Sequence, residues 1–203
     1  FGGSIPFSEV DLCPQGKYGN FYNRSVHEDH ISIVDCGPTP NATVYVNSSL
    51  TQEQYTFGDT TTTQYSDLRT AVFNKNNRTK NTIYLMNNLS TSYSSTTSPS
   101  NHVEFIKNNV KVNCMGYKYN DTTSDSGMRG FYANQEKHLE VRNCTLENFH
   151  TTIQLESGAQ IRVLNNSFIA KSEYRFIELY DGDDSNITNN TFHGDLTSDG
   201  IYI

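Results

Sequence analysis

The sequence predicts an all-β chain: a right-handed parallel β-helix (a solenoid) with one short N-terminal capping helix and an irregular N-terminal segment. Two series of short repeats predict it. The first is an apolar-x-apolar triplet that recurs six times at nearly even spacing. One strand-like triplet per period of twenty-odd residues is typical of a solenoid. The triplets are residues 83–85, 103–105, 131–133, 153–155, 177–179 and 201–203.

A second series of segments runs in phase with the triplets. Residues 141–146, 163–168 and 187–192 read VRNCTL, VLNNSF and ITNNTF, and residues 112–117 are a looser copy. The three clear copies are spaced as the triplets at 131, 153 and 177 are, so two markers keep one register. We therefore expect coils of two or three short strands joined by polar turns. Stacked coils bury each other's inward residues, and six triplets would make a rod of roughly 24 Å. A right hand is expected because parallel crossovers are almost always right-handed.

The first quarter of the chain does not show the repeat. Residues 1–50 form the irregular segment, with strand candidates at 32–34 and 43–46, and the β-helix is expected over 51–203. A short helix is predicted over about 66–74, with Ser66 as its N-cap and Leu68, Ala71 and Val72 at helical spacing. Such a helix just before the first coil would cover the open end of the solenoid, which otherwise exposes strand edges.

Composition excludes several classes of function. The chain has 203 residues, 34% apolar residues, no Trp and a net charge of −7. Its 15 basic residues do not cluster, so nucleic-acid binding is not expected. No long apolar run occurs, so no transmembrane segment is expected. The chain also lacks a basic-then-apolar leader, which is typical of a mature or excised segment.

Ten Asn-x-Ser/Thr sequons favour a secreted glycoprotein. The alternative is that Asn, Ser and Thr simply favour turns. We expect the strongest acceptors in loops, at Asn41, Asn77, Asn88 and Asn120. The ten candidate glycosylation sites are Asn23, Asn41, Asn47, Asn77, Asn88, Asn120, Asn143, Asn165, Asn186 and Asn189.

Four cysteines, Cys13, Cys36, Cys114 and Cys144, suggest disulfides in an oxidising compartment. Three pairings are possible. Cys13 with Cys36 would close the N-terminal region. Cys114 and Cys144 are separated by one long coil, so a bond between them would join neighbouring coils. Buried free thiols are the alternative, and the spacing does not fit a zinc ribbon.

The outward middle residues of the triplets would form a ladder on one face, which we consider a possible binding face. Its two carboxylates, Glu104 and Glu178, would lie three strand steps apart, roughly 14 Å. Glycosidases need about 5–5.5 Å or 6.5–9.5 Å between their carboxyl groups, so no catalytic pair, metal or cofactor is expected. Exposed tyrosines on this face would stack on sugar rings, contact a protein partner, or merely cover the sheet. The ladder consists of Tyr84, Glu104, Tyr132, Gln154, Glu178 and Tyr202.

Three motifs carry a family resemblance. The run at 64–72 (QYSDLRTAV), the strand at 81–85 (NTIYL) and the VLNNSF and ITNNTF coils resemble right-handed β-helix cell-surface proteins, in particular adhesin-like envelope proteins of methanogenic archaea and their bacterial relatives. The resemblance covers about residues 64–203. It implies the fold strongly and the function weakly, because pectate lyase-like enzymes share this fold. The chain departs from the pattern at 74–78, where a polar stretch replaces a Gly-Asp turn.

The combined prediction is an extracellular, N-glycosylated, non-enzymatic protein with a structural or adhesive role at the cell surface. Its expected partners are cell-surface glycans or other copies of itself, joined head-to-tail through open β-helix ends. The first alternative is a polysaccharide lyase or hydrolase, or a carbohydrate-binding β-helix. The second is a viral fibre or spike protein.

Overall fold

The computed structural model describes residues 18–19, 36–37, 43–49, 54–55, 62–74, 82–92, 101–123, 127–169, 175–180, 184–194 and 200–202. These ranges contain short strands and a single helix, α1 (Leu68–Asn74). Strands β1 (Tyr18–Gly19) and β2 (Cys36–Gly37) form a separate antiparallel pair. The described part contains no helix of the length and apolarity needed to cross a membrane.

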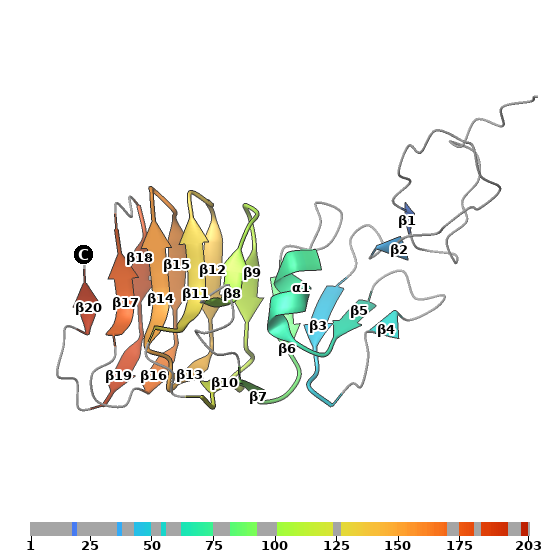
Figure 1. Ribbon diagram of the computed structural model, residues 1–203, viewed down its shortest axis with the longest axis horizontal. Helices are drawn as coiled ribbons and strands as arrows, with labels where there is room; N and C mark the ends of the chain where they lie inside the picture. Colours follow the sequence, from blue (N-terminus) through green and yellow to red (C-terminus); the bar gives the residue numbers. More distant parts are fainter. Residues whose placement is uncertain are drawn as a thin grey trace, which may run out of the picture.

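The remaining strands form three sheets (Figure 1). The eight-stranded sheet contains, in spatial order, β18 (Asn186–Thr188), β15 (Ile161–Leu164), β12 (Leu139–Arg142), β9 (Lys111–Asn113), β6 (Thr82–Leu85), β3 (Thr43–Val46), β5 (Thr62–Tyr65) and β4 (Gln54–Tyr55). The β7–β19 sheet contains β7 (Leu89–Thr91), β10 (Lys118–Asp121), β13 (Thr145–Glu147), β16 (Ser167–Ile169) and β19 (Thr191–His193). The β8–β20 sheet contains β8 (Asn101–Phe105), β11 (Arg129–Asn134), β14 (Thr151–Glu156), β17 (Arg175–Leu179) and β20 (Ile201–Tyr202).

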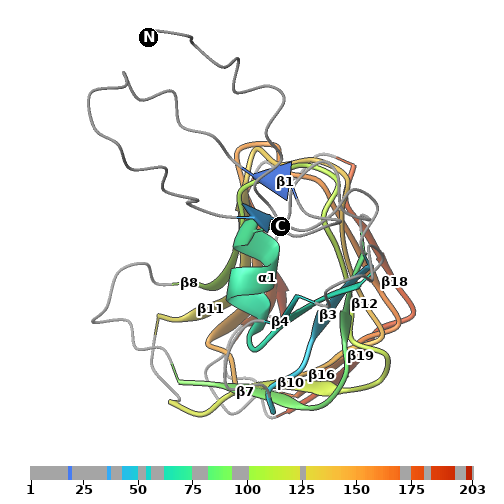
Figure 2. The same ribbon diagram turned by 90° about the vertical axis from the view of Figure 1, so that its right-hand side faces the viewer.

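From β6 onward, consecutive strands of the chain lie in different sheets, so three strands make one coil. From β6 onward, each strand pairs in parallel with the strand three places later, such as β11 with β14 and β12 with β15. Seen along the stack, the three sheets enclose a common interior (Figure 2). The predicted right-handed parallel β-helix is therefore confirmed.

One part of the predicted column is wrong. The triplets beginning at Val103, Phe131, Ile153, Ile177 and Ile201 pair in register in the β8–β20 sheet. Ile83, however, pairs with Val44 and Val112 in the eight-stranded sheet. The reason is that β6 and β8 belong to the same coil, so the step between their triplets advances the chain around the coil and not along the rod. The alternation of apolar residues is the same in every sheet and cannot reveal this difference.

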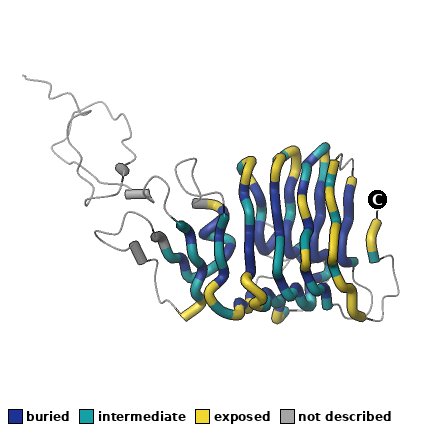
Figure 3. The backbone as a smooth tube through the Cα atoms, turned by 180° about the vertical axis from the view of Figure 1, so that it is seen from behind, coloured by how far each residue is buried: buried dark blue, intermediate teal, exposed yellow. Residues whose placement is uncertain are grey.

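Buried residues recur in every coil (Figure 3), and most of them are apolar side chains that fill the interior. Phe105 and Phe131 stack with ring centroids 5.8 Å apart, and the Tyr119 ring lies 5.8 Å from Phe131 and 5.1 Å from Phe149. Each such ring contributes about 1.5–3 kcal/mol by leaving water. Because inward residues of successive coils touch, each coil is stabilised mainly by its neighbours.

Helix α1 lies beside β8, on the side away from β11 (Figure 1). Leu68, Ala71 and Val72 are buried, as the helical spacing predicts. The N-cap is Asp67 and not the predicted Ser66, because a carboxylate oxygen of Asp67 accepts the Thr70 N–H at 2.8 Å. At the other end, the Lys107 ammonium donates to a terminal carbonyl of the helix, that of Phe73. Burial lowers the pKa of Lys107.

The eight-stranded sheet begins before the predicted boundary at residue 51. Strand β3 lies between β5 and β6 and pairs in parallel with both. Val44 and Val46 of β3 are fully buried and join the main core. The strand candidate at 43–46 is thus confirmed, whereas the candidate at 32–34 lies outside the described residues.

Candidate functional site

The outer face of the β8–β20 sheet carries five of the six predicted ladder residues. The strand register places Glu104 opposite Tyr132, Tyr132 opposite Gln154, and Gln154 opposite Glu178, with Tyr202 after Glu178. The sixth, Tyr84, lies on the outer face of the eight-stranded sheet and packs against Tyr45 with ring centroids 5.8 Å apart. Its inclusion in the ladder is therefore wrong, for the same reason as the register of Ile83.

A closed ring of side chains joins β11 and β14 on this face. The Arg129 Nε–H donates to Oε1 of Gln154 at 2.5 Å, and the Gln154 amide donates to Oε1 of Glu156 at 2.7 Å. The Tyr132 hydroxyl donates to the other oxygen of Glu156 at 2.9 Å. The Arg129 guanidinium lies 5.1 Å from the centre of the Tyr132 ring and completes the ring of contacts.

Arg129 also connects this ring to β8, because its NH1 group donates to Oδ1 of Asn101 at 3.2 Å. Burial raises the pKa of the Tyr132 hydroxyl, and its hydrogen bond to Glu156 raises it further. Tyr132 therefore stays protonated as a donor at neutral pH. The ring is a fixed polar platform with an aromatic side chain in it.

A second cluster lies toward β20. Arg175 is bonded to Glu178, and this hydrogen bond raises the pKa of Arg175. The same guanidinium lies 5.4 Å from the Tyr202 ring. Tyr180 directly follows β17, and its ring lies 5.7 Å from that of Tyr202. Both tyrosines remain about 40% exposed, so each presents ring surface to solvent.

The geometry of the carboxylates follows the sequence-based reasoning. Glu104 and Glu178 lie on β8 and β17, three strand steps apart, or roughly 14 Å. Their cross-strand neighbours are Tyr132 and Gln154, which are not carboxylates. Glu156 uses both oxygens within the ring described above. The face thus carries aromatic rings, carboxylates and an amide whose positions are fixed by contacts with one another, and Gln154 and Glu178 are only 6% and 4% exposed.

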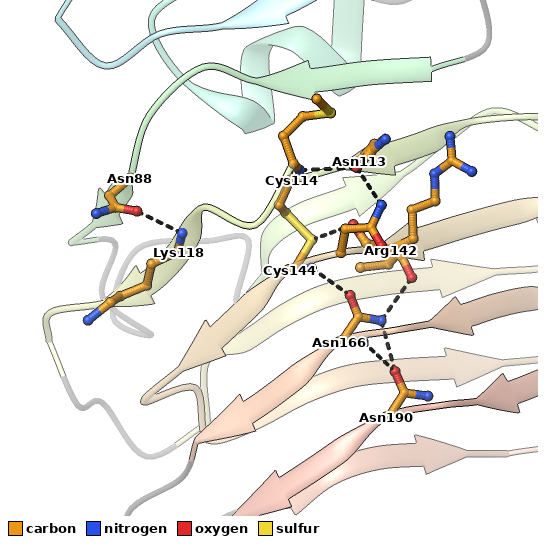
Figure 4. Close-up of a disulfide and its surroundings, with 11 residues drawn as sticks. Asn88, Asn113, Cys114, Lys118, Arg142, Cys144, Asn166 and Asn190 are labelled. Carbon is orange, nitrogen blue, oxygen red and sulfur yellow. Dashed lines mark hydrogen bonds between the residues drawn. A yellow bond between two sulfur atoms is a disulfide. The ribbon is translucent and has the colours of Figure 1, made fainter.

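The turns between the eight-stranded sheet and the β7–β19 sheet form a second ordered feature, the turn column (Figure 4). Asn143, Asn165 and Asn189 adopt the left-handed conformation in successive turns, with φ of 53°, 55° and 55°. Asparagine tolerates this region better than most residues. The repeated Asn in VRNCTL, VLNNSF and ITNNTF is explained by this backbone requirement.

The residue after each of these asparagines links neighbouring coils. Cys144 forms a disulfide with Cys114, with Cα atoms 4.7 Å apart. At the equivalent position of the next turn, Asn166 accepts the Cys144 N–H at 3.0 Å and donates to the Val141 carbonyl at 3.0 Å. Asn190 repeats both contacts one coil later, accepting the Asn166 N–H at 2.9 Å and donating to Val163 at 2.8 Å. The predicted bond between coils at Cys114 and Cys144 is confirmed. Cys13 lies outside the described residues, so its pairing with Cys36 stays a prediction.

The predicted glycosylation sites differ in accessibility. Asn88, Asn165, Asn186 and Asn189 are exposed, whereas Asn47, Asn120 and Asn143 are half-buried. Asn143 donates its amide N–H to Asn113 at 3.0 Å. Asn23, Asn41 and Asn77 lie outside the described residues. Glycan occupancy at all ten sites stays a prediction.

The sequence did not reveal a polar cluster inside the coils. The Thr91 hydroxyl lies 2.9 Å from Nδ1 of His102, and Nε2 of His102 lies 3.4 Å from Oδ2 of Asp121. All three side chains are buried. Burial alone would raise the pKa of Asp121, but hydrogen bonds from His102 and Thr123 outweigh it and lower that pKa. The three residues come from three different strands, β7, β8 and β10, and follow no motif, so no sequence signal marks them.

Of the acidic residues that follow β17, those in the described part of the chain do not belong to a group that could hold a metal ion. Asp181 and Asp183 lie outside the described residues, and Asp184 is an exposed turn residue with φ of 59°. Among the described residues, no group of three His, Cys, Asp or Glu side chains is placed to hold a metal ion.

A sequence model of the family described as "Right handed beta helix region" matches residues 117–203. The matched segment contains the strands from β10 to β20. The match and the parallel sheets together define the chain as a right-handed parallel β-helix protein. Comparisons with curated proteins and with solved structures find no match. The resemblance to adhesin-like envelope proteins stays a prediction.

Proposed function

We propose that this protein is an extracellular adhesive β-helix protein that binds cell-surface glycans on the outer face of the β8–β20 sheet. The observation that carries the proposal is the closed ring of Arg129, Gln154, Glu156 and Tyr132. Side chains held by mutual hydrogen bonds lose little freedom on binding, which favours recognition of polyhydroxylated ligands.

The tyrosines support the same proposal. Tyr180 and Tyr202 lie next to each other and expose part of their rings, and Arg175 holds one side of Tyr202. Aromatic rings with one exposed surface offer apolar area to a sugar ring, while neighbouring carboxylates and amides accept hydrogen bonds from its hydroxyl groups. A ladder that repeats every strand step suits an extended polymer.

The spacing of the two ladder carboxylates supports binding without hydrolysis, and the third carboxylate of this face, Glu156, uses both oxygens in hydrogen bonds with Tyr132 and Gln154. The separation of roughly 14 Å between Glu104 and Glu178 exceeds both distances that glycosidases use. Extracellular location is supported by the Cys114–Cys144 disulfide, because such bonds persist in oxidising compartments. The exposed sequons at Asn88 and Asn165 are consistent with N-glycosylation in the same setting.

The test is binding of the purified chain to an array of immobilised neutral glycans, followed by titration with the strongest ligand. We expect Tyr180→Ala and Tyr202→Ala each to weaken binding about five- to tenfold. Tyr84→Ala is the matched control, since it removes a tyrosine from a different sheet. Equal binding by all three variants and the wild type would refute the site. Release of reducing or unsaturated ends from the bound glycan would instead establish the enzymatic alternative.

A further inference from the structure

The outer face of the eight-stranded sheet carries a charge cluster that the proposed glycan face does not use. Glu140 on β12 is only 3% exposed. Its Oε1 lies 3.3 Å from Nε of Arg142, and its Oε2 lies 3.2 Å from NH1 of Arg162 on the neighbouring strand β15. One buried carboxylate therefore orients two guanidinium groups whose side chains remain 36% and 58% exposed.

Lys111 adds a third cation, because β9 places it directly opposite Glu140 on the other side. The outward residues from β9 to β18 thus contain three cations and one carboxylate, a local excess of two positive charges. They are Lys111, Asn113, Glu140, Arg142, Arg162, Leu164, Asn186 and Thr188.

This excess is opposite in sign to the net charge of the whole chain, which is −7. The β8–β20 face, by contrast, combines three carboxylates (Glu104, Glu156 and Glu178) with two arginines. A polyanion would therefore be attracted to this basic strip more strongly than to the β8–β20 face. Charge complementarity therefore selects the occupant of this face.

We propose that the outer face of the eight-stranded sheet binds an acidic polysaccharide through Arg142, Arg162 and Lys111. Each guanidinium uses one nitrogen toward Glu140 and keeps further N–H donors, which match the paired oxygens of carboxylate or sulfate groups. Lys111 and Arg162 lie two strand steps apart, or about 9.6 Å, so they would meet separate anionic groups of one extended chain.

Nucleic acid fits this face less well than an acidic polysaccharide. The affinity of a protein for nucleic acid depends on many contacts between cations and regularly spaced phosphates. Three cations on the face of an acidic protein can make few such contacts. The inference does not depend on the proposed glycan site, which lies on a different sheet and would take neutral sugars.

The experiment measures binding of the full chain to dextran sulfate, polygalacturonate and neutral dextran, at about 0.05 M and 0.5 M salt. We expect the two acidic polymers to bind at low salt and to weaken strongly at high salt, because screening shortens electrostatic reach. The double variant Lys111→Gln/Arg162→Gln should bind the acidic polymers about tenfold more weakly. Lys118→Gln, which removes one cation paired with Glu147 on the β7–β19 sheet, is a control that should bind like the wild type.

The single variant Lys111→Gln leaves both contacts of Glu140 intact and serves if the double variant is unfolded by circular dichroism. It should still weaken binding about threefold. The inference is overturned by absence of binding to both acidic polymers, by equal loss in Lys118→Gln, or by retained affinity in folded variants of the strip. Tighter binding of poly(dT) than of either acidic polysaccharide would also overturn it.

Discussion

In the turn column, two different kinds of bond link neighbouring coils at equivalent positions of successive turns. Toward the N-terminal end, Cys114 and Cys144 form a covalent bond between neighbouring coils. Toward the C-terminal end, Asn166 and Asn190 link the coils by hydrogen bonds to backbone groups of their neighbours (Figure 4). The disulfide restricts the unfolded chain but leaves backbone groups to find other partners, whereas each amide satisfies one N–H and one C=O. The two devices meet at Cys144, whose N–H is bonded to Asn166.

The largest expected effect is loss of the covalent link. Cys114→Ala/Cys144→Ala opens a loop of about 30 residues, and chain entropy predicts a loss of about 3.5 kcal/mol in the free energy of unfolding. Urea unfolding followed by circular dichroism measures it. Reduction of the wild type with dithiothreitol should give a similar loss, and an unchanged midpoint in both cases would contradict the stabilising role of the bond.

Removal of the buried amide should have the next largest effect. Asn166→Ala leaves the Cys144 N–H and the Val141 carbonyl without this partner in a buried site, which predicts a loss of about 2–3 kcal/mol. The same unfolding measurement applies. Asn165→Gly is the matched control, because the exposed neighbour needs only a residue that tolerates positive φ, and glycine does so. A larger loss in the control than in Asn166→Ala would reverse the assignment of roles.

Asn190→Ala should cost less, about 1 kcal/mol, although it removes the same kinds of bond. The reason is exposure, since Asn190 is half-buried and water can replace part of its contacts. Urea unfolding of Asn166→Ala and Asn190→Ala under the same conditions tests whether the stabilising free energy of an amide link depends on its burial. Equal losses at both positions would show that burial does not decide it.

The last prediction concerns the acid sensitivity of the cluster of Thr91, His102 and Asp121. Disulfides and side-chain amides do not titrate in acid. A loss of stability in acid therefore distinguishes this cluster from the disulfide and from the amide links of the turn column. The pKa of Asp121 is lowered in the folded state, so its ionisation stabilises the fold above the unfolded value of about 3.9. This stabilisation should disappear as pH falls through the lower folded pKa.

Thermal midpoints measured between about pH 2 and 6 test this expectation. Asp121→Asn should reduce the slope of the midpoint against pH in the acidic range, while Asn166→Ala should lower the midpoint without changing that slope. Identical slopes in the wild type and Asp121→Asn would show that ionisation of Asp121 does not stabilise the fold.

Much of the fold was predictable because the β-helix repeats a local requirement in every coil. The left-handed turn residue recurs at Asn143, Asn165 and Asn189, and the inward triplets recur with it. The first coil was assigned wrongly because β6 and β8 carry the same alternation of apolar residues. Consequently, Tyr84 was placed on the candidate face although it packs against Tyr45 elsewhere. The N-cap is Asp67, one residue after the predicted Ser66, and the sequence does not distinguish the two because both are good capping residues.

The sequence by itself determined that the chain winds into a parallel β-helix and that Glu104 and Glu178 lie far apart, and it offered Cys114 with Cys144 as one possible pairing. These features depend on periodicity and spacing, which a linear pattern records. Only the tertiary structure decided the contacts among Arg129, Gln154, Glu156 and Tyr132, the strip around Glu140, and the buried cluster at His102. These contacts depend on how side chains from different coils meet, and that meeting follows from register and rotamer, which no local pattern encodes.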